Sequence, residues 1–265
     1  MHRLLGKILI VSSLLALAFL LFTLFELESL GISMLHPRVI VEFSVFITLL
    51  VAGLILNFAV LGLMDQYRHP SGRRGRFAAK LMNKGHEPLT LWGLTKVKIA
   101  SYDVILDVGC GGGKTLGRLA QLAPLGKVFG VDNSSDMVDY SKKVNEKLIA
   151  RDRVQIVGGS VEKMFLPDNY FDLVTAFEAY YFWLNFHDAL KEIKRVLKPS
   201  GKLCLVNEMA KDGVYEIKNA KLIEKTHVHL VPVQEIRNAM LSIGFADVQV
   251  FTKTESPWNT VLAQK

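Results

Sequence analysis

The sequence predicts an α/β protein with a mostly parallel sheet, preceded by two apolar helices that cross a membrane. Two patterns predict this class. After about residue 100, short β-branched runs bounded by Gly, Asp or Pro alternate with stretches of helical periodicity. The first 64 residues instead hold two long runs without Lys, Arg, Asp or Glu. The chain of 265 residues is therefore expected to divide near residue 65.

Composition excludes several classes of protein. Half of the residues are hydrophobic, which is too apolar for a disordered chain or a nucleic-acid-binding tail, so no nucleic acid partner is expected. Residues 1–64 hold equal numbers of bases and acids, and the net charge of +7 therefore belongs to the remainder. The two cysteines, Cys110 and Cys204, are too few for a disulfide scaffold and lack zinc-site spacing. A reducing compartment and no metal site are expected.

The two apolar runs come first along the chain. They cover residues 8–25 and 43–64, which is 18 and 22 residues. A helix rising about 1.5 Å per residue needs roughly this length to cross a hydrocarbon core of about 30 Å. The connector between them contains Pro37 and more acids than bases. Residues 1–65 are therefore expected to form a transmembrane hairpin, with the lipid bilayer as partner.

Basic residues flank this hairpin on both sides. Arg3 and Lys7 precede the first run, and residues 66–86 contain six Arg or Lys and no acid. The positive-inside bias keeps both flanks cytoplasmic, so we expect a multi-pass membrane protein whose following domain lies in the cytoplasm. Residues 66–80 are interpreted as a basic juxtamembrane linker, with a flexible turn at 70–75 and a secondary attraction to anionic lipid.

Two other interpretations of the apolar runs stay open. The first run could be a cleaved signal peptide, although residues 25–33 offer no clear small-x-small cleavage site. Either run could be a buried helix of a soluble protein, although neither shows the polar face that such a helix normally has.

The second part of the chain predicts a sheet with crossover helices. Expected strands cover residues 104–108, 128–131, 154–157, 171–176 and 203–206. The clearest helix, over 186–197, has apolar residues on one side and charged residues on the other, and it ends before Pro199 and Gly201. Such alternation indicates right-handed crossovers and a parallel sheet covered on both faces. Ligands of such sheets bind at the carboxyl ends of the strands.

A glycine cluster follows the first expected strand. The strand ends in Asp107, and Gly109–Gly113 then opens onto a helix near residues 116–122. Glycines suit a tight turn that a ligand approaches closely. A phosphate-binding P-loop would need four residues between its glycines, and only three separate Gly109 from Gly113. A dinucleotide fingerprint would need a glycine where Lys114 stands, which weakens that interpretation without removing it.

Acids follow three of the expected strands. Asp107, Asp132 and Glu178 would line one pocket that repels a pyrophosphate and suits a ligand with an ammonium, a sulfonium and a ribose diol. S-adenosylmethionine is such a ligand, and Asp132 is placed to accept both ribose hydroxyls. The alternative role of Asp132 is a helix N-cap, for which Asn133, Ser134 and Ser135 are also available.

These motifs resemble those of class I S-adenosylmethionine-dependent methyltransferases, in particular the methyltransferase type 11-like domain. The resemblance rests on residues 107–113, Asp132, 171–174 and 196–202, in the usual order and separation, and it covers a domain at 81–265. It implies a Rossmann-like seven-stranded, mostly parallel sheet with a reversed last strand, whose final strands would lie at 248–251 and 258–263. It also implies an enzyme that uses S-adenosyl-L-methionine as cofactor.

The resemblance places a cofactor site on this chain. Asp107 and the glycines would line the methionine part, Asp132 the ribose, and Ser160 the adenine edge. Many members have an acid where Ser160 stands, and a hydroxyl accepts that hydrogen bond more weakly. Met137 would cover an adenine face or belong to the ordinary core. The expected cofactor-binding residues are Asp107, Gly109, Cys110, Gly111, Gly113, Asp132, Asn133, Met137, Ser160, Val161, Phe177 and Glu178.

The acceptor side is less determined. Aromatic residues at 179–184 would form its wall, and the segment 77–98 would cap the cofactor site. The expected substrate-binding residues are His86, Tyr180, Tyr181 and Trp183, and the candidate general bases are Glu178, Tyr180, Tyr181, His187, His86 and Glu208, among which the sequence does not choose.

We therefore expect a membrane-anchored methyltransferase acting on a small-molecule or lipid acceptor. Two alternatives stay open: a catalytically silent membrane module that binds S-adenosylmethionine, and an NAD-dependent oxidoreductase.

Overall fold

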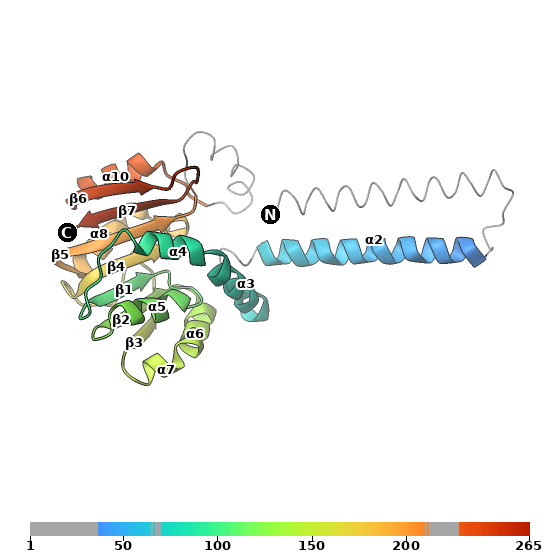
Figure 1. The fold of residues 1–265 in the computed structure, drawn as a ribbon, viewed down its shortest axis with the longest axis horizontal. Coiled ribbons are helices and arrows are strands. Elements are labelled where there is room, and N and C mark those ends of the chain that lie inside the picture. Colours follow the sequence, from blue (N-terminus) through green and yellow to red (C-terminus); the bar gives the residue numbers. More distant parts are fainter. Residues whose placement is uncertain (1–36, 65, 67–69, 210, 212–227) are drawn as a thin grey trace. The chain divides into compact units, whose positions relative to one another are not determined.

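A computed structural model describes residues 37–64, 66, 70–209, 211 and 228–265 (Figure 1). Its contacts divide the chain into two units, Met1–Met64 and Asp65–Lys265. The first apolar run, residues 8–25, lies outside the described residues.

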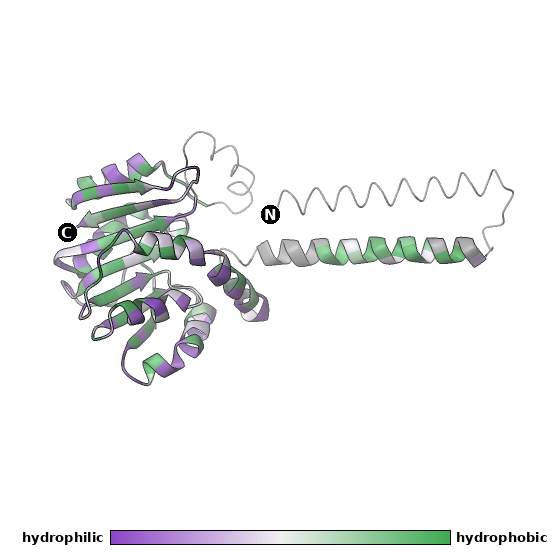
Figure 2. Cartoon of the chain, viewed as in Figure 1, coloured by the Kyte–Doolittle hydropathy of each residue, from purple (hydrophilic) through white to green (hydrophobic). Residues whose placement is uncertain are grey.

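Helix α2 (Pro37–Met64) contains the second apolar run and is 28 residues long. It begins at Pro37, because the first turn of a helix tolerates a residue without a backbone N–H. Figure 2 shows mostly apolar colouring along its described residues, and several of its large apolar side chains are exposed, including Val41, Leu49 and Ile55. Among the residues that the structure describes, no helix meets the length and hydropathy required to cross a membrane. The expected pair of membrane helices is therefore not confirmed.

The second unit contains the predicted sheet. Its seven strands follow the order β3-β2-β1-β4-β5-β7-β6. Strands β1 to β5 pair in parallel, and β7 runs antiparallel to both β5 and β6, which confirms the reversed last strand. The strands are β1 (Val104–Val108), β2 (Lys127–Asp132), β3 (Val154–Gly158), β4 (Phe171–Phe177), β5 (Leu197–Asn207), β6 (Ala246–Thr252) and β7 (Asn259–Gln264).

Helices cover both faces of this sheet and give three layers (Figure 1). On one face, Leu89 of α4 (Glu87–Leu94), Leu116 of α5 (Lys114–Leu122) and Val138 of α6 (Ser135–Val144) share a core with strand residues. On the other face, α8 (Phe186–Val196) and α10 (Val233–Ser242) pack in a second core. The remaining described helices are α3 (Gly72–Gly85), α7 (Glu146–Ile149) and the 3₁₀ turn η2 (Tyr180–Phe182).

Strand β5 is longer than the sequence predicts. The expected turn at 196–202 lies within it, because Leu197 already pairs with Phe171 before the register shifts to Lys202 opposite Leu173. Residues 198–201 fill this irregularity, with Ser200 at a φ of 65°. The predicted helix correspondingly ends at Val196.

The expected linker is also different. The interpretation of residues 70–75 as a flexible turn is wrong, because α3 begins at Gly72. Small residues allow this helix to pack closely on the domain: Gly75, Ala78 and Ala79 are buried, and α3 packs against α6. A Cβ on Gly75 would lie 2.6 Å from the carbonyl carbon of Pro70, so a glycine at position 75 lets the Pro70 backbone approach the helix closely.

The strand order determines where a ligand can bind. Strands β2, β1 and β4 are neighbours and parallel, so their carboxyl ends meet at one edge. The register places Asp107 beside Gly130 of β2 and Thr175 of β4. Asp132 ends β2 beside Gly158. The acids that the sequence placed at strand ends therefore lie along one edge of the sheet.

Candidate active site

A cavity opens at this edge of the sheet, beside α3 and the start of α4. It brings together most of the residues that the sequence singled out. From the expected sets it is lined by Asp107, Gly109, Cys110, Gly111, Asp132, Asn133, Met137, Ser160, Val161, Phe177, Glu178, His86 and Trp183. Gly113, Tyr180 and Tyr181 are not among the lining residues.

The glycine turn forms the floor of this cavity. Gly109, Gly111 and Gly113 have φ angles of 71°, 49° and 73°, in the left-handed region that favours glycine. A Cβ on Gly109 would lie 2.7 Å from the Ala179 Cβ, whereas one on Gly111 would meet nothing closer than 4.0 Å. Gly111 therefore exposes its backbone to a ligand.

Gly113 has a different role from the one expected. A Cβ there would overlap the Ser141 hydroxyl oxygen, on the side of α6. Its carbonyl accepts a 2.9 Å hydrogen bond from the buried Asn145 side chain. Gly113 thus joins the turn to α6 and does not line the cavity.

Asp132 is held by the turn that it faces. Its two carboxylate oxygens accept hydrogen bonds from the Gly111 N–H at 2.8 Å and the Ser134 N–H at 2.9 Å. Burial raises the pKa of Asp132, and these two bonds oppose the shift. The N-cap of α6 is Ser134, whose hydroxyl accepts from the Met137 N–H. Because each carboxylate oxygen has further lone pairs, Asp132 can also accept hydroxyl donors from a ligand.

Asp107 lies deeper, only 2% exposed, and accepts a 2.7 Å hydrogen bond from the Thr175 hydroxyl. Burial, with a smaller contribution from the charge of Asp132, raises the pKa of Asp107 to about 7, and the Thr175 bond opposes the rise. Cys110 lies between the two acids in the same wall, and burial raises the pKa of its thiol. A cationic ligand would offset the cost of ionising Asp107 in this buried position.

Met137, Ser160 and Val161 also line the cavity. The sequence lacks an acid at position 160, yet the structure brings one close: the Glu162 carboxylate forms a short hydrogen bond with the Ser160 hydroxyl and lines the same cavity. Glu162 also accepts from the Leu184 N–H at 2.8 Å. Sequence reasoning missed Glu162, and an acid two residues after the expected position was the available signal.

An ion-pair network closes one side of the cavity. Glu87, at the start of α4, contacts Lys114 at 2.6 Å and Arg118 at 2.7 Å, both on α5. Hydrogen bonds from these two cations lower the pKa of Glu87. All three residues line the cavity, together with Asn83 and Thr90, and none of the five was predicted. Lys114 stands where a dinucleotide fingerprint would need a glycine, and here it links α5 to α4 through its ion pair with Glu87.

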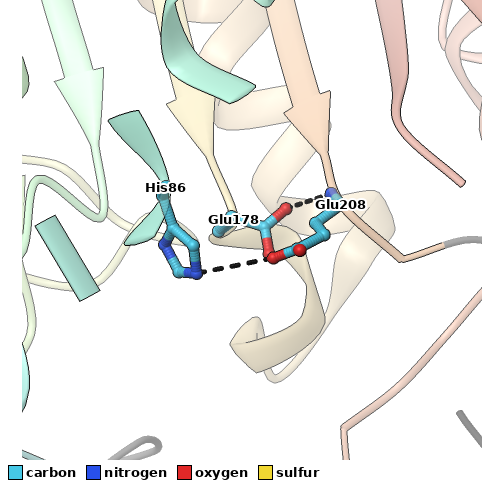
Figure 3. Close-up of side chains that lie close together, drawn as sticks. All are labelled: His86, Glu178 and Glu208. Carbon is cyan, nitrogen blue, oxygen red and sulfur yellow. Dashed lines mark hydrogen bonds and ion pairs between the residues drawn. The ribbon is translucent and has the colours of Figure 1, made fainter. Parts of the chain in front are cut away.

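His86, Glu178 and Glu208 converge beside this cavity, from the α3–α4 junction and the ends of β4 and β5 (Figure 3). The His86 Nε2 lies 3.7 Å from a Glu208 carboxylate oxygen. Glu178 accepts a short hydrogen bond from the Glu208 N–H and a 3.1 Å bond from the Tyr181 hydroxyl. Its φ of 55° is unusual for a residue other than glycine.

Burial is the largest influence on the pKa values of Glu178 and His86. Burial and the charge of Glu208 raise the pKa of Glu178 to about 8, which the two hydrogen bonds oppose. Burial lowers the pKa of His86, and Glu208 opposes that shift. The three side chains offer donor atoms within 4.8 Å of one another, so they could also hold a metal ion. The sequence did not suggest this ligand set, and the absence of a metal stays a prediction.

The aromatic segment after β4 is divided between core and cavity. Phe182 and Trp183 line the cavity. Tyr180 and Tyr181 are only 2% and 3% exposed, with ring centroids 4.2 Å apart. The Tyr181 hydroxyl donates to Glu178 and accepts from the Met209 N–H at 3.1 Å. These tyrosines were expected to bind substrate, whereas the structure places them behind the wall, and Tyr181 reaches it through Glu178.

The family model described as a methyltransferase domain matches residues 106–205, which contain the glycine turn, both aspartates and β4. The chain therefore carries a methyltransferase domain. The methyltransferase domain matches the expected fold in its seven-stranded sheet and in its reversed last strand.

Two curated methyltransferases illustrate which known proteins are similar to this domain. Juvenile hormone acid O-methyltransferase of Drosophila melanogaster is 32% identical over 173 residues, covering 58% of this chain and 57% of that protein. Demethylmenaquinone methyltransferase of Symbiobacterium thermophilum is 41% identical over 105 residues, covering 39% and 42%. This chain thus spans about half the length of the curated relatives it matches.

A solved structure shares the fold of the methyltransferase domain. Phosphoethanolamine N-methyltransferase 2 of Haemonchus contortus, in complex with S-adenosyl-L-methionine, aligns with a TM-score of 0.63 at 16% identity. The alignment covers 72% of this chain and 57% of that chain.

Proposed function

We propose that this protein transfers a methyl group from S-adenosylmethionine to a lipophilic or membrane-associated acceptor. One observation carries the methyl-transfer proposal: Asp107, Asp132 and the open backbone of Gly111 line a single cavity that also has an aromatic wall. The acids suit a cationic ligand, and the aromatic wall suits an apolar acceptor.

The residues present fit this cofactor. Asp132 would accept the ribose hydroxyls, and Gly109 and Gly111 would leave room for the methionine part beside Asp107. Met137 and Val161 are buried apolar residues that line the same cavity, and an adenine ring would pack against them. Ser160 and Glu162 offer oxygens to its amino group.

Bound S-adenosylmethionine supplies an already activated methyl group, so the protein has little covalent chemistry to perform. Its residues must hold the acceptor in line with that methyl group and exclude water. Phe177, Phe182 and Trp183 line the cavity beside Glu178 and can do both. The acceptor atom forms a bond to the methyl carbon, the bond from carbon to sulfur breaks, and its electron pair stays on sulfur as S-adenosylhomocysteine.

A base is required only when the attacking atom carries a proton. Among the six candidates, His86 and Glu178 line the cavity, and Glu208 contacts His86. His187 is exposed and lies outside the lining. We therefore assign proton acceptance to the cluster of His86, Glu178 and Glu208, which is partly buried and adjoins the aromatic wall.

The lipophilic acceptor is supported by two considerations. Relatives of the domain are named for juvenile hormone acid and demethylmenaquinone as acceptors. The sequence of residues 8–25 and 43–64, free of charge, supports attachment to a membrane, with the domain on the cytoplasmic side by the positive-inside bias.

Methyl transfer can be measured without knowing the acceptor. The full chain, radiolabelled S-adenosylmethionine and a fractionated membrane extract should give a labelled product that partitions into organic solvent. The Asp132→Ala variant is the control, since it should bind the cofactor more weakly and transfer less label. Binding of S-adenosylhomocysteine without label transfer to any fraction would instead indicate a catalytically silent module.

Membrane attachment has a separate test. The full chain should stay in the pellet after alkaline carbonate extraction of membranes, because apolar spans resist release by high pH. Recovery in the supernatant would contradict the hairpin and leave the methyl-transfer proposal intact.

A further inference from the structure

We propose that helix α3 lies on an anionic lipid surface through its outer face, while its inner face forms a wall of the cofactor cavity. The inner face consists of Gly75, Ala78 and Ala79, which are buried against the domain. Ala79, Met82 and Asn83 line the cavity. The outer face is defined by six residues: Arg73, Arg74, Phe77, Lys80, Leu81 and Lys84.

The outer face exposes two large apolar side chains. Phe77 is 55% exposed and Leu81 is 44% exposed. They lie four residues apart, so they are adjacent on one side of the helix, opposite the buried small residues. Neither side chain belongs to the two hydrophobic cores of the domain. Folding of the domain therefore does not account for their position.

Basic residues flank this apolar pair. Helical periodicity places Arg73, Arg74 and Lys80 beside Phe77, and Lys84 beside Leu81. These four side chains are exposed, and α3 contains no Asp or Glu. Arg76 differs from them, because it lies 3.8 Å from Asp136 of α6 and faces the domain.

The combination of exposed apolar and basic residues on α3 identifies an anionic lipid surface as the partner. A helix with exposed aromatic and aliphatic residues, surrounded by Lys and Arg, has the pattern of helices that lie in the interface of an anionic bilayer. A merely solvated basic face would not require exposed Phe77 and Leu81. The helix also begins eight residues after the apolar helix α2 ends at Met64. The inference rests on the proposed membrane attachment for a high local concentration of lipid.

The test places an environment-sensitive label on the outer face. The full chain with Phe77→Cys carries a nitrobenzoxadiazole label, and the two native cysteines are buried, so unmodified protein serves as the labelling control. The matched position is Phe165→Cys, because Phe165 is 91% exposed and lies between β3 and β4. Each protein is added to vesicles of phosphatidylcholine, with or without phosphatidylglycerol.

At position 77 we expect a blue shift, and quenching by spin-labelled lipid, in vesicles with phosphatidylglycerol, both reversed by high salt. Position 165 should report water in every vesicle. Neutralising two charges, as Lys80→Gln with Lys84→Gln, should lower the equilibrium constant for lipid contact at position 77 about 30-fold, from about 1 kcal/mol per basic residue. Lys142→Gln with Lys143→Gln, on the exposed end of α6, should have little effect.

The outcomes separate this inference from the proposed function. A chain that floats with phosphatidylcholine vesicles while position 77 still reports water in anionic vesicles overturns the inference and leaves membrane attachment intact. If the chain floats only with anionic vesicles and position 77 lies in lipid, the result supports the inference. The same result contradicts the proposed transmembrane hairpin. An equal response at positions 77 and 165 would also overturn the inference, because the contact would then not belong to α3.

Discussion

At the scale of single residues, Asp132 shows how one side chain serves both the turn and the ligand. Its oxygens accept the N–H groups of Gly111 and Ser134, which fixes the carboxylate at the cavity wall. The side chain that would bind ribose is thus positioned by the same glycine turn that would approach the methionine part. Removing it should affect binding and the turn together.

We expect Asp132→Ala to weaken binding of S-adenosylhomocysteine about 10-fold to 100-fold, since hydrogen bonds to a charged group contribute about 1.5 to 3 kcal/mol each. The melting temperature of the ligand-free chain should also fall, because the two N–H donors lose their acceptor. Isothermal titration calorimetry measures the first effect, with Asp139→Ala on the exposed side of α6 as control. An unchanged dissociation constant would refute the ribose assignment.

Glu178 should make stability depend on pH. Its folded pKa of about 8 lies above the ordinary value of 4.5, so the unfolded chain loses this proton first as pH rises. The contribution of Glu178 to stability is therefore lost progressively between about pH 4.5 and about pH 8. Glu178→Gln should raise the melting temperature at pH 8 relative to wild type, with little change at pH 5.

Glu192 provides the control of opposite sign. The Arg195 side chain holds the pKa of Glu192 below its ordinary value, so Glu192→Gln should lower the melting temperature at neutral pH and less so in acid. Parallel pH profiles for Glu178→Gln and wild type would contradict a raised pKa at Glu178.

At the scale of elements, the turn between β1 and α5 depends on Gly113. Its φ is 73°, and the Ser141 hydroxyl occupies the space that a Cβ would need, so the turn leaves no room for a side chain. Gly113→Ala should destabilise the domain by about 2 kcal/mol or more, from backbone strain and overlap with α6. Urea unfolding at constant pH measures the change.

Gly117→Ala is the matched control substitution, in the helix α5 that follows this turn. Gly117 lies inside α5, and a Cβ there would meet the Asn145 side-chain oxygen at an ordinary 3.5 Å. Gly117→Ala should therefore be neutral or stabilising by up to about 1 kcal/mol. Equal destabilisation by both alanines would show that crowding at Ser141 does not explain the role of Gly113.

At the scale of the whole molecule, the methyltransferase domain has its own cores. Every residue of both hydrophobic clusters lies after residue 88. A chain of residues 66–265 should therefore fold alone and bind S-adenosylhomocysteine as tightly as the full chain in detergent. Calorimetry tests this expectation, and loss of the cooperative melting transition in the shorter chain would contradict it.

The local pattern of strands, turns and acids in this protein could be predicted from its sequence alone. Alternating periodicity predicted strands such as β1 within a residue or two, and acids at strand ends predicted Asp107 and Asp132 in one pocket, because parallel strands bring their carboxyl ends to one edge. The glycine turn was readable because positive φ angles restrict residue type.

Which residues from distant segments meet depends on the folded chain. Glu87 reaches Lys114 and His86 reaches Glu208, although no local spacing connects the members of either pair. Tyr181 turns into the core rather than the cavity for the same reason. Periodicity records which side of an element is apolar, whereas contacts across the cavity follow from how the crossovers place one element against another.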